Sequence, residues 1–124
     1  MHTTLFFVLA LAGALVTVAA APDKALGMAL LSAVVDQNGN LDRGAGIVSS
    51  ARVSIGQYEV IFNQDVRECT YVATVGGTTI DTYTNKMIAS PARRDQQDNG
   101  VWVRVSAGSG HVDAPFHLTV VCGR

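Results

Sequence analysis

Hydrophobic and polar residues alternate along the stretch GAGIVSSARVSIGQYEVIFN, from Gly44 to Asn63. In its second half, Tyr58, Val60 and Phe62 fall on one side of an extended chain. A period of two residues is typical of a β-strand, because successive side chains of a strand point to opposite faces. The stretch therefore predicts one long β-hairpin and not a helix.

We expect this hairpin to turn at Gly56-Gln57, because glycine suits the first central position of a type II′ turn. That turn gives three cross-strand pairs: Ile55 with Tyr58, Val53 with Val60, and Ala51 with Phe62. Paired residues point to the same side of the sheet, so all six side chains would form one apolar face. The polar residues would lie on the other face: Ser50, Arg52, Ser54 and Glu59.

Further segments with a strand pattern occur on both sides of the hairpin. They are Leu30–Asp36, Cys69–Val75, Thr78–Tyr83, Lys86–Pro91, Val101–Ala107 and Phe116–Cys122. Turn signals separate them, such as Asn38-Gly39, which would pair the first segment with Leu41–Gly44 or with the start of the hairpin. Short strands at this spacing predict an all-β fold, a small antiparallel β-sandwich of about seven strands.

A continuous apolar run from Leu5 to Val18 precedes every charged residue of the chain. The small residues Ala19-Ala20-Ala21 follow it and are typical of a signal peptidase site. We expect residues 1–20 to be a signal peptide and residues 21–124 to be a single β-sandwich domain. The alternative is an uncleaved membrane anchor, since no Lys or Arg precedes the run.

The predicted leader sets the expected location. After its cleavage we expect no integral membrane span, and a protein that is secreted, periplasmic or attached to the cell surface. The formal net charge of −1 shows no excess of positive charge that would attract nucleic acid, so we expect no nucleic-acid partner.

The two cysteines open one predicted strand and close another, at Cys69 and Cys122. Antiparallel neighbours bring the start of one strand beside the end of the other, within reach of a disulfide. Export to an oxidising compartment favours the bridge. Two separate buried thiols are the alternative, and no CxxC motif supports a metal site or a redox pair.

Two groups of residues have the composition of metal ligands, namely Asp36, Asn38, Asn40 and Asp42, and His111, Asp113 and His117. The first group alternates like the ligands of a calcium loop but lacks the final Glu and the correctly placed glycine, and a polar hairpin tip explains it. The second could bind zinc, but surface histidines explain it as well. We therefore expect no metal and no cofactor.

No motif indicates catalysis. The chain has no G-x-S-x-G elbow and no cysteine with an activating histidine nearby in sequence. Carboxylate pairs such as Glu59 with Asp65, or Asp95 with Asp98, could be imagined in a glycosidase, but polar turns account for them. We expect that the chain is not an enzyme.

Trp102 is the candidate binding residue. It lies on the outward face of its predicted strand beside Arg104, and an exposed Trp next to an Arg is typical of a contact hot spot. The loop residues Arg93 and Arg94 would extend this surface. A subunit interface and a glycan-stacking platform would use the same residue, and the alternative is a Trp covered by a neighbouring strand or loop.

Several segments together resemble a small β-domain of secreted bacterial proteins, similar to the C-terminal domains of collagen-like or phage-fibre-like chains. The resemblance spans Ala33 to Cys122. Its marks are G-x-Y-E-V-x-F at Gly56–Phe62, Cys69 followed by YVAT, and PFHL leading to Cys122. The resemblance implies a β-sandwich with a Cys69–Cys122 bridge and trimeric assembly, although this chain has no Gly-X-Y stalk.

These features predict an exported, non-catalytic module that self-associates in a structural role, such as a surface or fibre cap. The expected form is a trimer or dimer that the substitution Trp102→Ala breaks. The alternative is a recognition module that binds a glycan or a protein through Trp102, Arg104 and the Arg93-Arg94 loop.

Overall fold

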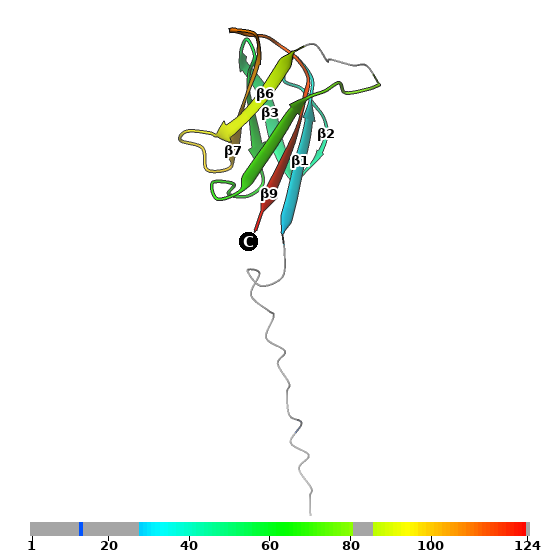
Figure 1. Cartoon of the computed structure of the whole chain (residues 1–124). Coiled ribbons are helices and arrows are strands. Elements are labelled where there is room, and N and C mark those ends of the chain that lie inside the picture. Colours follow the sequence, from blue (N-terminus) through cyan, green and yellow to red (C-terminus); the bar gives the residue numbers. More distant parts are fainter. Residues whose placement is uncertain (1–12, 14–27, 81–85, 124) are drawn as a thin grey trace, which may run out of the picture.

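The computed structural model describes Gly13, residues 28–80 and residues 86–123. The described chain forms two antiparallel sheets that pack face to face (Figure 1). Its strands are β1 (Ala29–Val35), β2 (Leu41–Ala45), β3 (Ile47–Ser54), β4 (Gln57–Phe62), β5 (Thr70–Val75), β6 (Met87–Arg93), β7 (Gly100–Ala107), β8 (Gly110–His111) and β9 (Phe116–Cys122). The predicted all-β sandwich is therefore confirmed, with nine described strands in place of about seven.

One sheet has the strand order β2-β1-β9-β5, and the other has the order β3-β4-β7-β6 with β8 beside β7. We call them sheet A and sheet B. The predicted signal peptide, residues 1–20, lies outside the described residues apart from Gly13. Among the described residues, none belongs to a helix with the length and apolar character needed to cross a bilayer.

The core lies between the sheets and is built from alternate residues of the four central strands. These inward residues are Leu31, Ala33 and Val35 in β1, Tyr58, Val60 and Phe62 in β4, Val101, Val103 and Val105 in β7, and Phe116, Leu118 and Val120 in β9. Full burial of such a large apolar side chain stabilises the fold by roughly 1.5–3 kcal/mol. The two-residue period thus predicted the inward faces of these strands correctly.

The register of the central hairpin differs from the prediction. Ser54 pairs with Gln57, so the turn residues are Ile55 and Gly56 and not Gly56 and Gln57. Gly56 has φ +62° and takes the second central position of the turn. Val53 is left as an extra residue in a β-bulge, and beyond it Arg52 pairs with Tyr58.

The prediction of one six-residue apolar face is therefore wrong for β3, the first strand of the hairpin. Ala51 pairs with Glu59 and not with Phe62, and Val53 and Ile55 are 53% and 56% exposed. Only the second strand contributes to the core. β3 is an edge strand of sheet B, and a bulge at each end of it limits pairing with further strands.

An edge strand was expected at Thr78–Tyr83, and this prediction is wrong for Thr78–Ile80, which form no strand. Residues 81–83 lie outside the described part. After β5 the chain instead crosses the outer face of sheet A, where the Gly77 carbonyl oxygen lies 2.8 Å from His117 Nε2. Arg43 Nη1 on β2 donates to the Thr78 carbonyl oxygen at 2.9 Å. We call residues Gly76–Ile80 the strap.

Pro91 was expected to stop its strand, but β6 continues to Arg93. β6 is an edge strand of sheet B, the position at which a sheet tolerates a proline. The polarity of Ala92–Gly100 predicts a surface loop there, but the loop is shorter and runs from Arg94 to Asn99.

Candidate functional site

Trp102 lies on the outer face of sheet B, as predicted, because its neighbours Val101 and Val103 are fully buried. Its indole ring is half-buried, and what covers it is Arg94. The Cζ atom of Arg94 lies 4.6 Å from the centroid of the ring, a cation–π contact. Glu59 pairs with Trp102 across the sheet, and its carboxylate accepts a 2.6 Å hydrogen bond from Arg94 Nε.

The structure brings three of the four predicted binding residues to this face. Arg104 is exposed and lies two residues from Trp102 on the same strand, so it points to the same side. Arg94 lies over the indole. Arg93 is the exception, because its register position opposite buried Val101 belongs to the inner side of β6.

Arg93 instead lies near the other edge of the sandwich. Hydrogen bonding from Arg67 is the main cause that lowers the pKa of Asp65, and the charge of Arg93 lowers it further. Burial raises the pKa of Tyr71, and the charge of Arg93 opposes part of that rise. The doublet Arg93-Arg94 therefore does not form one cationic surface, because adjacent residues of an extended chain point to opposite faces.

The predicted disulfide is confirmed. Cys69, just before β5, is joined to Cys122 at the end of β9, with the two Cα atoms 4.4 Å apart. β5 and β9 are antiparallel neighbours in sheet A, so the strand start and the strand end meet as expected.

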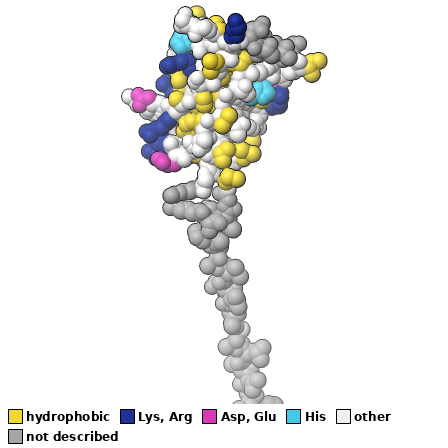
Figure 2. Space-filling view, in the orientation of Figure 1, with side chains coloured by type: hydrophobic (Ala, Val, Ile, Leu, Met, Phe, Trp, Pro, Cys, Tyr) yellow, Lys and Arg dark blue, Asp and Glu magenta, His cyan; other side chains and the backbone are white. Residues whose placement is uncertain are grey.

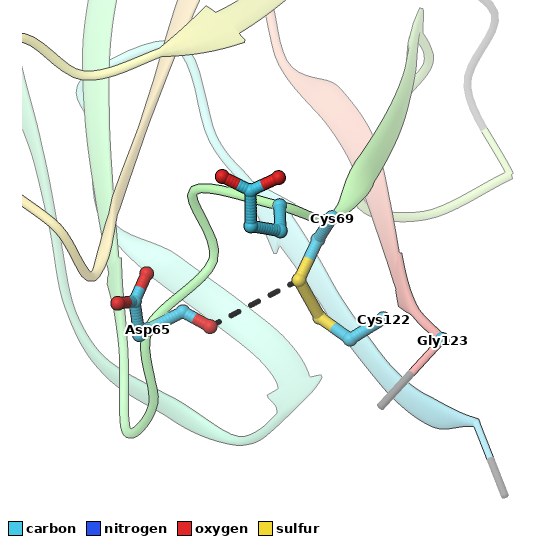
Figure 3. Close-up of a pocket in the computed structure, with 5 residues that line it drawn as sticks. Asp65, Cys69, Cys122 and Gly123 are labelled. Atoms are coloured by element: carbon cyan, nitrogen blue, oxygen red, sulfur yellow. Dashed lines mark hydrogen bonds between the residues drawn. A yellow bond between two sulfur atoms is a disulfide. The ribbon is translucent and has the colours of Figure 1, made fainter. Parts of the chain in front are cut away.

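A cavity of about 310 Å³ lies beside this bridge (Figure 3). Asp65, Glu68, Gly123 and the two cysteines line it. The Sγ atom of Cys69 lies 3.9 Å from the carbonyl oxygen of Asp65, a contact and not a hydrogen bond, since a disulfide sulfur carries no proton. The Asp65 carboxylate is held by Arg67, whose Nη2 donates at 2.6 Å, and this hydrogen bonding lowers the pKa of Asp65 to about 2.

At the opposite end of the sandwich, Asp113 joins three segments. Its Oδ1 accepts hydrogen bonds from Arg52 Nε at 2.9 Å and from the Gly56 N–H at 2.8 Å, and Tyr58 Oη lies 3.3 Å away. Tyr58 Oη also donates to the Gln37 carbonyl oxygen at 2.8 Å. Burial of Tyr58, with the charge of Asp113, raises the pKa of this phenol to about 12.

The two candidate metal groups have other partners. Asp36 Oδ1 accepts from the backbone N–H groups of Asn38 and Asn40, which is the geometry of a polar hairpin tip. Asp113 is bound to Arg52, and His117 lies against the strap. Among the described residues, no group of three or more His, Cys, Asp or Glu side chains is arranged to hold a metal ion.

Sequence reasoning missed the cavity and the Asp113 network. The cavity depends on how the Asp65–Glu68 turn approaches the chain end, for which no local pattern exists. No local pattern marks the network either, because Arg52 was expected on the polar face of the hairpin and its partner Asp113 lies 61 residues further along the chain.

Comparisons with models of protein families, with curated proteins and with solved structures give no match. The class of this protein is therefore defined by its fold, a small two-sheet β-sandwich bridged by one disulfide. The resemblance to C-terminal domains of fibre-like chains stays a prediction.

Proposed function

We propose that the chain is an exported, non-catalytic β-sandwich module that self-associates in a structural role at the cell surface or as a fibre cap. Three features support export: the apolar leader, the small residues that follow it, and a disulfide, which is typical of an oxidising compartment.

The observation that carries self-association is the amount of apolar surface left outside a well-filled core. Large hydrophobic side chains are more than half exposed on the outer faces and edges of both sheets, namely Met28, Leu30, Val48, Val53, Ile55, Val72 and Ile88, and also Ile80 on the strap. These side chains lie outside the core, and each buries less than half of its surface. Groups of exposed apolar side chains are typical of protein contact surfaces.

The experiment is sedimentation equilibrium of residues 21–124, purified with the disulfide intact, from micromolar concentrations to about 1 mM. We expect the average mass to rise above that of one chain within this range. A mass equal to one chain at every concentration would overturn the proposal.

A second function is favoured by the Trp102 face, which would serve recognition of a glycan or a protein. The support is that Arg94 is held by Glu59 and lies over the indole, while exposed Arg104 extends the same face. Preorganised aromatic and guanidinium groups of this kind are typical of binding hot spots. Binding to a glycan array that Trp102→Ala abolishes would support this function, and the absence of binding across the array would argue against it.

A further inference from the structure

The outer face of sheet A carries a regular array of uncharged side chains. The strand register places Leu30, Val121 and Thr70 in one row across β1, β9 and β5. The next row runs from Ala45 on β2 through Ser32 and Thr119 to Val72 on β5. We call these seven residues the uncharged patch.

The patch is open to solvent. Leu30 and Val72 are 64% and 60% exposed, and Thr70 and Thr119 are exposed as well. Hydrophobic side chains gather over the lower ends of β1 and β9 in Figure 2. Met28, which is 74% exposed, continues the surface at the lower end, and the strap borders it at the upper end.

The composition of the patch contrasts with that of the other outer face. Sheet B presents Glu59, Arg94 and Arg104 around Trp102, whereas none of the seven patch residues carries a charge. The nearest cation in register is Arg43, and its guanidinium group is bonded to the strap and to Asp42. Burial of the patch would therefore leave no ion without a partner.

We propose that this patch binds the same patch of a second copy, face to face about a two-fold axis. The inference rests on the proposed self-association and names the surface that performs it. In a two-fold contact a charge near the axis meets its own copy, and an uncharged surface avoids that repulsion. The net charge of −1 adds little long-range repulsion between copies.

The size of the surface sets the strength of the contact. With strands about 4.8 Å apart and a rise of about 3.4 Å per residue, the two rows of the patch are three and four strands wide and together cover about 230 Å². Two copies then bury about 450 Å² in projection, and more in accessible area because the side chains protrude from the sheet. That is below the lower limit of about 1,000 Å² for stable specific interfaces, so the dimer is weak.

Thr119 is the residue that locates the axis. It lies on central strand β9, between Ser32 and Val72, and therefore near the centre of the patch. Near a two-fold axis a residue lies close to its own copy in the partner. Sheets that pack face to face are about 10 Å apart, so a thiol-to-thiol cross-linker of that length would join two copies at this position.

The experiment uses the variants Thr119→Cys and Ser90→Cys of the oxidised chain, treated with such a cross-linker. Ser90 is the matched control, an exposed hydroxyl residue on the outer face of sheet B. We expect covalent dimers from Thr119→Cys at several times the yield from Ser90→Cys. Equal yields from the two variants would overturn the face assignment.

Sedimentation of Thr119→Arg and Ser90→Arg provides the second readout. Two like charges would meet at the axis in Thr119→Arg only, so we expect its dissociation constant to rise at least tenfold while Ser90→Arg matches the wild type. An unchanged unfolding midpoint would show that both variants fold. If the wild type associates and Thr119→Arg associates equally well, the inference is wrong while self-association stands; if the wild type stays monomeric, self-association itself is wrong.

Discussion

The guanidinium group of Arg94 covers the indole of Trp102, with Cζ 4.6 Å from the centroid of the ring. The 2.6 Å hydrogen bond from Arg94 Nε to the Glu59 carboxylate holds it there. Trp102 is thus shielded by Arg94, a side chain of the polar loop. The sequence suggested either an exposed Trp or a Trp covered by a strand or loop, and the observed arrangement lies between the two. Trp102 is the single tryptophan of the chain, so its fluorescence reports on this contact alone.

We expect Arg94→Ala to increase the quenching of Trp102 fluorescence by acrylamide, because the substitution removes the group that covers the ring. Glu59→Gln should give a smaller increase, since it removes the charge that fixes Arg94 but leaves an acceptor. Arg104→Ala is the control and should leave quenching close to that of the wild type. The same quenching constant for all three variants would contradict the contact.

The Asp113 network predicts a dependence of stability on pH. Hydrogen bonds from Arg52 and from the Gly56 N–H lower the pKa of Asp113 below its usual value. Its stabilisation is therefore complete above the unfolded pKa of about 3.9 and is lost as the pH falls through the lower folded value. At neutral pH we expect Asp113→Ala to lower the free energy of unfolding by about 1–2 kcal/mol.

Urea unfolding at neutral pH and at about pH 2 would measure both effects. The difference in stability between wild type and Asp113→Ala should shrink at the lower pH, because protonation of the wild-type carboxylate weakens its charge-assisted hydrogen bonds. Asp95→Ala, in the exposed 94–99 turn, serves as the control. A difference that is the same at both pH values would exclude a charge-dependent role for Asp113.

Tyr58 should ionise well above the range of an ordinary tyrosine. Burial, with the neighbouring charge of Asp113, raises the pKa of its phenol from 10.0 to about 12. The neutral form is thus favoured in the folded state, so its contribution to stability is complete below about pH 10 and is lost as the pH rises through about 12. Ultraviolet titration of the wild type and of Tyr58→Phe should differ by one group that titrates near the higher value. If the group that Tyr58→Phe removes from the titration has an ordinary tyrosine pKa, the burial of this hydroxyl is contradicted.

The strands and the inward faces followed from local patterns, whereas the register of the central hairpin did not. Each inward residue of β4, β7 and β9 is set by alternation and by the need to bury apolar surface, and both are visible in the sequence. The turn at Ile55-Gly56 is fixed instead by Asp113, which accepts the Gly56 N–H from 57 residues further along the chain. A two-residue window contains no information about that partner.

The candidate surface was predicted in part for the same reason. Alternation correctly placed Trp102 and Arg104 on one outer face. Alternation also places Arg93 and Arg94 on opposite faces. The sequence did not predict this, because the polarity of the segment around these residues indicated a loop, and a loop has no alternation. The strap could not be predicted, since it depends on contacts of Gly77 and Thr78 with β9 and β2.

The disulfide should contribute a large share of the stability. It closes a loop with a sequence separation of 53. The chain-entropy model then predicts that the double variant Cys69→Ala/Cys122→Ala loses about 4 kcal/mol of unfolding free energy. Urea unfolding of this variant and of the reduced wild type would test the value, because both lack the bridge and only the variant lacks the sulfur atoms. A loss below about 1 kcal/mol in both would mean that the bridge is not a main stabilising element.

Alanine substitutions at three glycines would distinguish the cost of a left-handed backbone from the cost of steric overlap. Gly110 lies in β8 with open space around its Cα, Gly108 has φ +59° and the same open space, and Gly56 has φ +62° in a closed site. A Cβ at Gly56 would lie 2.4 Å from the Val105 carbonyl oxygen and 2.7 Å from that of Val112. The three positions therefore differ by one physical factor at a time.

We expect Gly110→Ala to leave the free energy of unfolding within about 0.5 kcal/mol of the wild type. Gly108→Ala should cost about 1–2 kcal/mol, because a left-handed conformation is unfavourable for a residue with a Cβ. Gly56→Ala should cost more than Gly108→Ala, since β7 and the segment after β8 would have to move away. Equal losses at Gly108 and Gly56 would show that the hairpin tip adapts to a side chain, and that the hydrogen bond from the Val105 N–H to the Gly56 carbonyl oxygen does not hold the turn rigidly against β7.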